Sequence, residues 1–180
     1  MISSKPFRKR GQLHITETIA VLFIFFILIV FAIIFYYQYQ KVSLKEKQQE
    51  LLGQRAVKTT LKTIFLPELI CSRGDAEPED NCFEVSKLEK AGGLMQQHTV
   101  DYYFNIFSYA NITVHQIYPE NEAKIFKIYT KEITKTLSDG MVVPGWSNRE
   151  TSLFVVTLKE DRFEGEPSYG FGYLKVEVYS

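Results

Sequence analysis

The pattern of hydrophobic and polar positions sets one segment apart from the rest of the chain. Seventeen consecutive residues, from Ile19 to Phe35, carry no polar side chain, and Tyr36 and Tyr37 follow them. At a helical rise of about 1.5 Å per residue this run spans roughly 26 Å, close to the hydrocarbon thickness of a bilayer. A globular helix that is apolar all round over this length would have to be buried on every side. The pattern therefore predicts a membrane-spanning helix at about residues 18–37, with tyrosines at its headgroup end.

Helical periodicity continues beyond the apolar run, as far as Pro67. Hydrophobic residues recur there at helical spacing, with charged residues on the other face. The hydrophobic positions are Leu44, Leu51, Val57, Leu61, Ile64 and Phe65. No proline interrupts the segment, and Gly53 is its one weak point. We expect one continuous helix over about residues 16–66, with a globular domain covering the apolar stripe of its second half.

The pattern of residues 67–180 predicts a β-rich head domain, which we expect to be extracytoplasmic. Period-two alternation with β-branched and aromatic residues marks four strands, and short polar turns separate them. The strands lie at 111–118, 123–132, 151–160 and 169–179. The segment 98–110 is ambiguous between a helical turn and a strand. The expected fold class is α+β: a long N-terminal helix packed on a C-terminal antiparallel β-sheet domain.

A short helix is expected before the four strands. Ser86 and Glu89 have the spacing of a capping box, in which two side chains satisfy backbone groups of the first helical turn. We expect this helix to start at Lys87 and to stop at the glycine pair Gly92 and Gly93.

The chain contains two cysteines, Cys71 and Cys82, with ten residues of a mainly polar, acidic loop between them. A disulfide that closes this loop would stabilise the fold by roughly 2–3 kcal/mol. Two buried free thiols are the alternative, although the loop between them is too polar for a core. A pair of cysteines at this spacing does not form a zinc site.

Composition and charge narrow the choice of function only slightly. The 180 residues include 21 basic and 21 acidic ones, so the formal net charge is zero and gives no reason to expect a nucleic-acid partner. The histidines His14, His98 and His115 are isolated and lack the spacing of metal ligands. No catalytic or nucleotide-binding motif is present. We therefore expect a protein that is not an enzyme and needs no cofactor or metal.

Basic residues flank the apolar run on both sides. The N-terminal flank carries Lys5, Arg8, Lys9 and Arg10, and the C-terminal flank carries Lys41, Lys45, Lys47 and Arg55. Because the count is tied, orientation depends on two other features: the first flank is more compact, and the cysteine pair suits an oxidising space. Both favour a single-pass protein of the cell membrane whose C-terminal domain lies outside the cytoplasm. A cleaved secretory signal is the alternative, but its apolar region would be shorter and followed by small residues.

The triplet Asn111-Ile112-Thr113 has the pattern of an N-glycosylation acceptor. Glycosylation of Asn111 would be meaningful only if this region faces the cell exterior. The alternative is that Asn111 simply begins a strand.

The residues that precede the apolar run resemble a known family. A basic cluster is followed by Gly11 and Gln12, a few further residues, Glu17 and then the uninterrupted apolar helix. This order is similar to archaeal type IV pilin-like precursors, which carry a class III signal peptide, and the resemblance covers about 30 of the 180 residues. In that family a membrane aspartyl protease, the prepilin-type peptidase, cuts between the small residue and the glutamine. The apolar segment stays on the mature protein, spans the membrane and later packs in a filament core.

The resemblance implies cleavage between Gly11 and Gln12, which would remove residues 1–11 as a basic leader and leave 12–66 as the long helix. It also implies that Glu17 pairs with the new amino terminus of a neighbouring subunit. The family usually has its glutamate fifth in the mature chain, whereas Glu17 would be sixth. Glu17 could instead lie among lipid headgroups at the first turn of the helix, where the helix dipole favours an anion.

Two functions are compatible with these patterns. The first is a pilin-like structural subunit or minor component of a type IV filament, with membrane lipid, other pilin-like subunits and the prepilin-type peptidase as partners. The second is a single-pass, signal-anchored surface protein whose outer domain binds a partner without filament assembly. The second function predicts that residues 1–10 remain on the mature chain.

Overall fold

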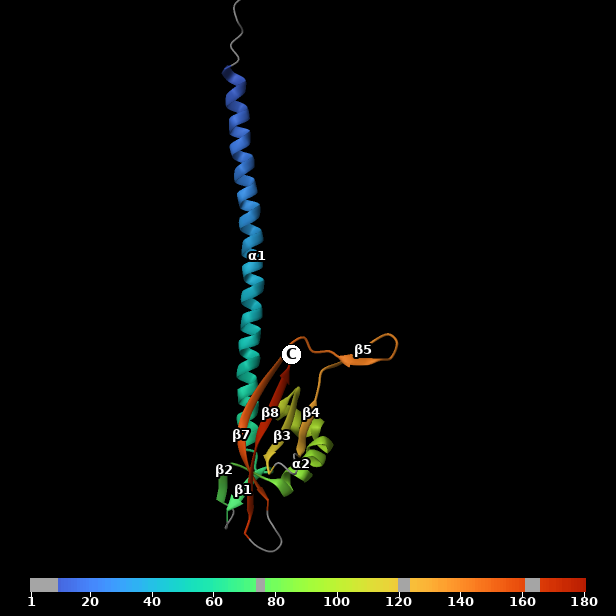
Figure 1. The fold of residues 1–180 in the computed structure, drawn as a ribbon. Coiled ribbons are helices and arrows are strands. Elements are labelled where there is room, and N and C mark those ends of the chain that lie inside the picture. Colours follow the sequence, from blue (N-terminus) through green and yellow to red (C-terminus); the bar gives the residue numbers. More distant parts are fainter. Residues whose placement is uncertain (1–9, 74–76, 120–123, 161–165) are drawn as a thin grey trace, which may run out of the picture. The chain divides into compact units, whose positions relative to one another are not determined.

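The computed structural model describes residues 10–73, 77–119, 124–160 and 166–180 (Figure 1). The chain forms two compact units, residues 1–47 and 48–180. Helix α1, Arg10–Ile64, contributes to both units as one uninterrupted element, which confirms the predicted long helix. Most of the predicted basic leader, residues 1–9, lies outside the described residues.

The second unit is an α+β domain built on a six-stranded sheet, which confirms the predicted fold class. Its strand order is β1-β2-β7-β8-β3-β4 (Figure 1). The strands are β1 Ile70–Arg73, β2 Glu77–Glu84, β3 Ala110–Tyr118, β4 Ile125–Lys131, β7 Arg149–Glu160 and β8 Ser168–Tyr179. A separate two-stranded sheet consists of β5 Thr134–Thr136 and β6 Val142–Pro144. The helices of this unit, besides the end of α1, are α2 Val85–Gln97, the π-helical turn η1 Thr99–Tyr103 and α3 Phe104–Phe107.

The sheet is mixed, whereas an antiparallel sheet was predicted. Strand β2 runs parallel to β7, with Cys82 opposite Thr157, and the other pairs within this sheet are antiparallel. Strands β1 and β2 occupy most of the segment predicted to be an acidic loop. That segment lacks an alternating hydrophobic pattern, so its strand conformation comes from the pairing of β1 with β2 and of β2 with β7, and not from local preference.

One face of the sheet forms the core of the second unit. Leu174, Val176 and Val178 of β8 are fully buried and lie opposite Val114, Ile112 and Ala110 of β3. Helix α2 adds buried side chains at Val85, Leu88, Ala91 and Met95. These residues belong to one hydrophobic cluster, to which the second half of α1 also contributes.

The face of α1 that is buried in this core is not the predicted apolar stripe. The buried positions are Leu52, Ala56, Thr59, Thr60, Thr63 and Ile64. The predicted positions other than Ile64 are exposed: Leu44, Leu51, Val57, Leu61 and Phe65 are between 48% and 65% exposed. The prediction was therefore wrong for five of its six residues, because it ranked the two faces by hydrophobicity alone.

Three of these six buried residues are threonines, and two of them form hydrogen bonds within the helix. The Thr60 hydroxyl donates a hydrogen bond of 2.9 Å to the Ala56 carbonyl, and Thr63 donates one of 2.9 Å to Thr59. Such bonds to the preceding turn remove the cost of burying the hydroxyl. A narrow helix face then lies close to the rest of the core without a large apolar side chain at every turn.

Two basic side chains of α1 also bind the second unit through backbone carbonyls. The Arg55 guanidinium donates to the carbonyls of Tyr109 and Tyr179, at 3.2 and 3.3 Å. The Lys62 amine donates to the Ile106 carbonyl at 2.9 Å. The second half of α1 is therefore an integral part of the head domain.

Helix α2 differs from its predicted form at both ends. It begins at Val85, and the Ser86 hydroxyl donates to the Glu84 carboxylate, so the predicted capping box of Ser86 and Glu89 does not form. It also continues through Gly92 to Gln97. A Cβ at Gly92 would lie 2.3 Å from the Lys127 carbonyl oxygen. Gly92 is thus needed for close contact between α2 and β4, and the prediction of a helix stop was wrong.

Candidate assembly surfaces

The first unit presents an apolar surface that nothing else in the described chain covers. Every described side chain from Glu17 to Val42 is exposed. The most apolar 18-residue window of this helix has a mean hydropathy of 3.3, and none of it is buried. By length and composition α1 is therefore able to cross a membrane, and it could anchor the protein there.

The candidate processing and assembly residues precede this surface. Gly11 and Gln12 lie at the start of α1, which begins at Arg10. Glu17 is exposed and lies about two turns further along the helix. Stabilisation of an anion by the helix dipole fades beyond the first turn. The helix dipole therefore does not account for the presence of Glu17.

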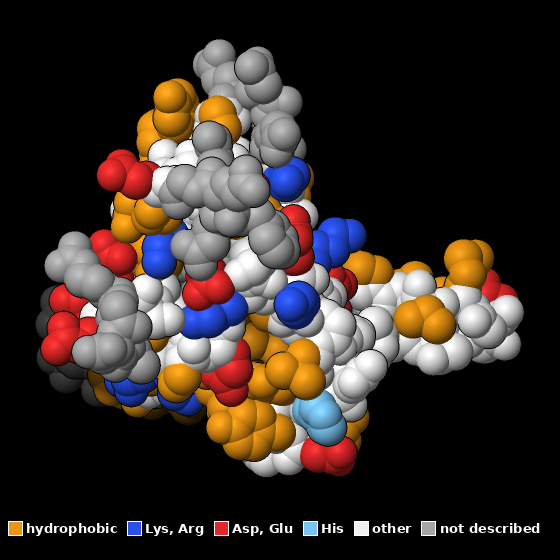
Figure 2. All heavy atoms as spheres, turned by 90° about the horizontal axis from the view of Figure 1, so that it is seen from below, with side chains coloured by type: hydrophobic (Ala, Val, Ile, Leu, Met, Phe, Trp, Pro, Cys, Tyr) orange, Lys and Arg blue, Asp and Glu red, His pale blue; other side chains and the backbone are white. Residues whose placement is uncertain are grey.

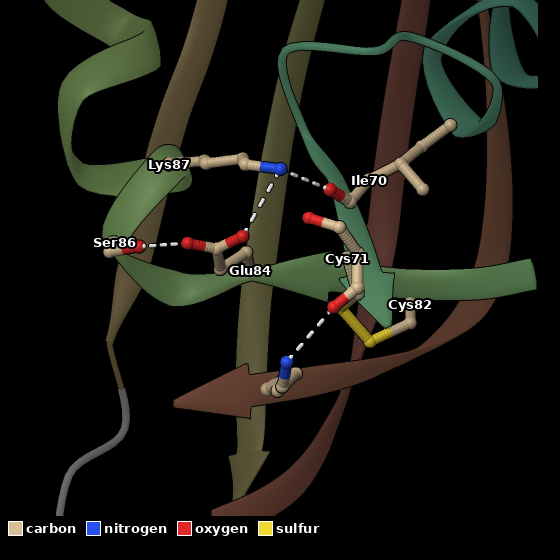
Figure 3. Close-up of polar contacts among 8 residues, drawn as sticks. Ile70, Cys71, Cys82, Glu84, Ser86 and Lys87 are labelled. Carbon is tan, nitrogen blue, oxygen red and sulfur yellow. Dashed lines mark hydrogen bonds and ion pairs between the residues drawn. A yellow bond between two sulfur atoms is a disulfide. The ribbon is translucent and has the colours of Figure 1, made fainter. Parts of the chain in front are cut away.

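Cys71 and Cys82 form a disulfide, as predicted (Figure 3). Their Cα atoms are 5.3 Å apart, and the bond joins the neighbouring strands β1 and β2. Both residues are almost completely buried, at 0% and 2% exposure. The bond thus has a structural position, in which solvent does not reach the sulfur atoms.

Lysines beside the disulfide bind the backbone of the edge strand β1 (Figure 3). Lys87 donates to the Ile70 carbonyl at 2.6 Å and forms an ion pair of 3.1 Å with Glu84, and Lys159 donates to the Ser72 carbonyl at 3.1 Å. Burial raises the pKa of Glu84. Hydrogen bonds from Ser86 and Lys87, together with the lysine charges, outweigh this effect, so the pKa of Glu84 lies below its ordinary value. Two acceptors of an edge strand are thereby occupied, which disfavours pairing with another chain at this edge.

One half of the sheet face opposite the core is polar, and part of it is buried. The Glu177 carboxylate is 7% exposed and contacts Lys175 at 3.1 Å and Arg149 at 3.5 Å. Asn111 donates to the same carboxylate at 3.2 Å and accepts from Thr130 at 3.2 Å. The Asn111 amide nitrogen that a glycan would occupy is therefore engaged in a hydrogen bond near the start of strand β3. Glycosylation at Asn111 stays a prediction, and it would have to break this hydrogen bond.

The other half of this face is apolar and aromatic, and we call it the outer patch. It consists of His115, Tyr118, Ile125, Val155, Phe171 and Tyr173. Pairing across β7, β8, β3 and β4 places Val155, Tyr173, His115 and Ile125 in one row. His115 stacks on Tyr173 with ring centroids 4.7 Å apart, and Tyr118 stacks on Phe171 at 5.9 Å.

The outer patch is uncharged, and its members are exposed except for His115 and Tyr173, which are half-buried. Val155 is 71% exposed, Ile125 60% and Tyr118 54%. Burial and the Lys175 charge lower the pKa of His115 below its ordinary value, against an opposing contribution from Glu177. The His115 ring is thus mostly neutral at pH 7, and the patch is an apolar surface of the head.

A second exposed feature is a hairpin made by β5, β6 and the turn between them, which we call the arm. Every residue from Thr134 to Val142 is exposed, including the apolar side chains of Leu137, Met141 and Val142. The turn is held by hydrogen bonds between Leu137 and Met141 and between Gly140 and Leu137. Gly140 has a φ of +81°, which glycine adopts without strain. Figure 2 shows the arm projecting from the rest of the second unit, with hydrophobic side chains near its end.

Sequence reasoning did not identify the outer patch or the arm as functional surfaces. The turn signal Ser138-Asp139-Gly140 marks the tip of the arm. Its strands are only three residues each, which is too short for an alternating pattern to be recognised. The outer patch is formed by four strands and exists only once their register is set.

Among the described residues, no group of three or more His, Cys, Asp or Glu side chains lies together in a way that could hold a metal ion. Comparison with known proteins returned no matching family, curated protein or solved structure. A functional proposal therefore depends on the surfaces of the chain itself.

Proposed function

We propose that this protein is a pilin-like subunit or minor component of a type IV filament system, anchored and assembled through the apolar half of α1. The observation that carries the proposal is the dual character of that helix. Its first half is exposed at every described residue from Glu17 to Val42, while its second half is built into an α+β head. A surface this apolar requires lipid or other protein around it. One helix that first spans a membrane and then packs against neighbours meets both requirements in turn.

The disulfide supports a location of the head outside the cytoplasm. Disulfides persist in oxidising spaces and are rare in the cytosol. With the head outside, Gly11 and Gln12 lie on the cytoplasmic side, where the peptidase of the resembled family acts. The protein would then be a single-pass membrane protein or part of an extracellular filament.

Glu17 would have its role in assembly. Cleavage between Gly11 and Gln12 places a new amino group about one and a half turns before Glu17 on the same helix. In an assembly, the amino group of one subunit would then be a suitable partner for the Glu17 carboxylate of another. Such pairing removes the cost of an isolated carboxylate beside an apolar surface.

The alternative is a signal-anchored surface protein whose head binds a partner and whose helix remains in the membrane. The position of Glu17, sixth and not fifth after the cleavage point, favours this alternative. In that case residues 1–10 would stay on the chain, and the apolar half of α1 would contact only lipid.

The deciding experiment is mass spectrometry of the mature N-terminus, on protein purified from its own membranes. A chain that starts at Gln12 supports processing and the pilin-like proposal. A chain that still carries Met1 to Gly11 contradicts it and supports the plain anchor. In processed protein, Glu17→Gln should reduce assembly while membrane insertion is unchanged, and normal assembly of this variant would remove Glu17 from the mechanism.

A further inference from the structure

The arm has a fixed base and an uncovered tip. At the base, Gly145 donates to the Ile133 carbonyl at 2.7 Å, and the Trp146 ring packs against the Tyr179 ring at 5.5 Å. The Arg149 guanidinium also lies over the Trp146 ring, 5.8 Å from the ring centroid. At the tip, Leu137, Met141 and Val142 are 48%, 63% and 64% exposed. The arm is therefore held in position by the head while its apolar side chains face solvent.

An isolated two-stranded hairpin is only marginally stable in water, and exposed apolar clusters mark contact sites. The arm stands clear of the rest of the second unit (Figure 2), so the cover for its tip must come from another molecule. Lipid is a poor cover, because the tip also carries the charged Asp139 and the polar Ser138. A protein surface with an apolar centre and a basic rim would fit both parts of the tip.

The outer patch of the same chain has an apolar centre of this kind, with lysines in the neighbouring row. Its centre is the uncharged row Val155, Tyr173, His115 and Ile125. The next row toward the polar half contains Leu153, Lys175, Thr113 and Lys127, and Lys127 is exposed. Four strands at about 4.8 Å spacing make a surface roughly 14 Å wide, enough to receive a two-stranded ribbon.

We propose that the arm of one copy docks on the outer patch of a second copy, with Leu137, Met141 and Val142 on the apolar row and Asp139 beside Lys127. Because the two contact surfaces differ, the interface is heterologous and can repeat without closing, as a filament requires. The inference builds on the proposed self-assembly and adds a contact between heads. Anchoring in one membrane would raise the local concentration of copies and favour this contact.

The test is intermolecular cross-linking of the full-length protein in its own membranes. Copies with Met141→Cys and copies with Val155→Cys are produced together, and a short thiol-specific cross-linker is added. The native cysteines do not react, because they are joined in a buried disulfide. The matched control pairs Met141→Cys with Glu89→Cys, an exposed position on α2.

We expect at least tenfold more mixed dimer from the arm–patch pair than from the control pair. Asp139→Lys should lower the yield several-fold, and Lys127→Glu in the partner copy should restore it. Three results would overturn the inference: equal yields from both pairs, preferential linking of Met141→Cys copies to one another, or quenching of a fluorophore at position 141 by spin-labelled lipid.

A reporter in the membrane segment separates failure of this inference from failure of the proposed function. Copies with Phe35→Cys should cross-link to one another if the apolar helices associate. Cross-links at position 35 without the arm–patch cross-link would overturn only the arm contact. The absence of both would also contradict the proposed self-assembly.

Discussion

The two halves of α1 differ in how hydrophobicity relates to burial. In the first half, Ile19 to Phe35 are all apolar, and all are exposed. In the second half, some threonines are buried while some leucines are exposed: Thr63 is 0% exposed and Leu61 is 48% exposed. This difference shows that the apolar composition of a long segment indicates its environment, such as a membrane. The face that a helix buries against protein depends on shape, spacing and satisfied hydrogen bonds.

The largest expected effect is a change in the free energy of unfolding. Two adjacent leucines, one on each face of the second half of α1, test it. Leu52 is 5% exposed and Leu51 is 65% exposed. Leu52→Ala should lower the free energy of unfolding of the head by about 2–5 kcal/mol, since it leaves a cavity in the core. Leu51→Ala should change it by less than about 0.5 kcal/mol. Thermal unfolding of both full-length variants in detergent measures the difference, and equal losses would mean that the assigned buried face is wrong.

The first half of α1 should tolerate changes of shape and reject charge. Leu28→Arg places a charge near the centre of the predicted span, at a cost of about 2.5–3.5 kcal/mol of insertion free energy. Leu28→Phe keeps the segment apolar and should leave insertion unchanged. Leu51→Arg, on the exposed face of the second half, should also leave it unchanged. Retention of each variant in alkali-washed membranes measures insertion, and full retention of Leu28→Arg would count against a membrane span.

Alanine substitutions at the two neighbouring glycines of α2 should have smaller effects on stability, and the two effects should have opposite signs. A Cβ at Gly92 would meet the Lys127 carbonyl oxygen at 2.3 Å, whereas a Cβ at Gly93 has nothing within 4 Å. Gly92→Ala should therefore destabilise the head by about 1–3 kcal/mol. Gly93→Ala should stabilise it by about 0.4–1 kcal/mol, because alanine restricts the unfolded chain and favours the helix. Denaturant unfolding of the pair tests this, and stabilisation by both would show that α2 does not need close contact with β4.

The smallest expected effect is a pH dependence from His115. Its pKa in the folded protein lies below the ordinary value of 6.5, so between these two values the unfolded chain binds more protons than the folded one. The contribution of His115 to stability is complete above about pH 6.5 and is lost as the pH falls through the folded pKa. His115→Gln should flatten the decline in unfolding midpoint between pH 7 and pH 5. Glu84 would not obscure this, because its own pKa lies below 4.5.

The sequence by itself determined the membrane-competent segment, the long helix, the α+β class and four strands of the sheet. These features follow from local patterns that are long and regular: an unbroken apolar run, a helix without proline, and alternation over eight or more residues. The disulfide between Cys71 and Cys82 was also predicted, because the loop between the two cysteines is too polar for a core in which free thiols would be buried.

Only the tertiary structure decided the buried face of α1, the path of α2 and the pairing of β2. Thr59, Thr60 and Thr63 are buried because neighbouring elements surround them and their hydroxyls have partners within the helix, as shown for Thr60 and Thr63. Gly92 lies inside α2, where it allows the Lys127 carbonyl to approach the helix closely. Strand β2 exists because β1 and β7 pair with it. In each case the contacts that decide the structure join different elements, or the local sequence pattern is too weak to show them. Local propensity therefore gave the wrong answer.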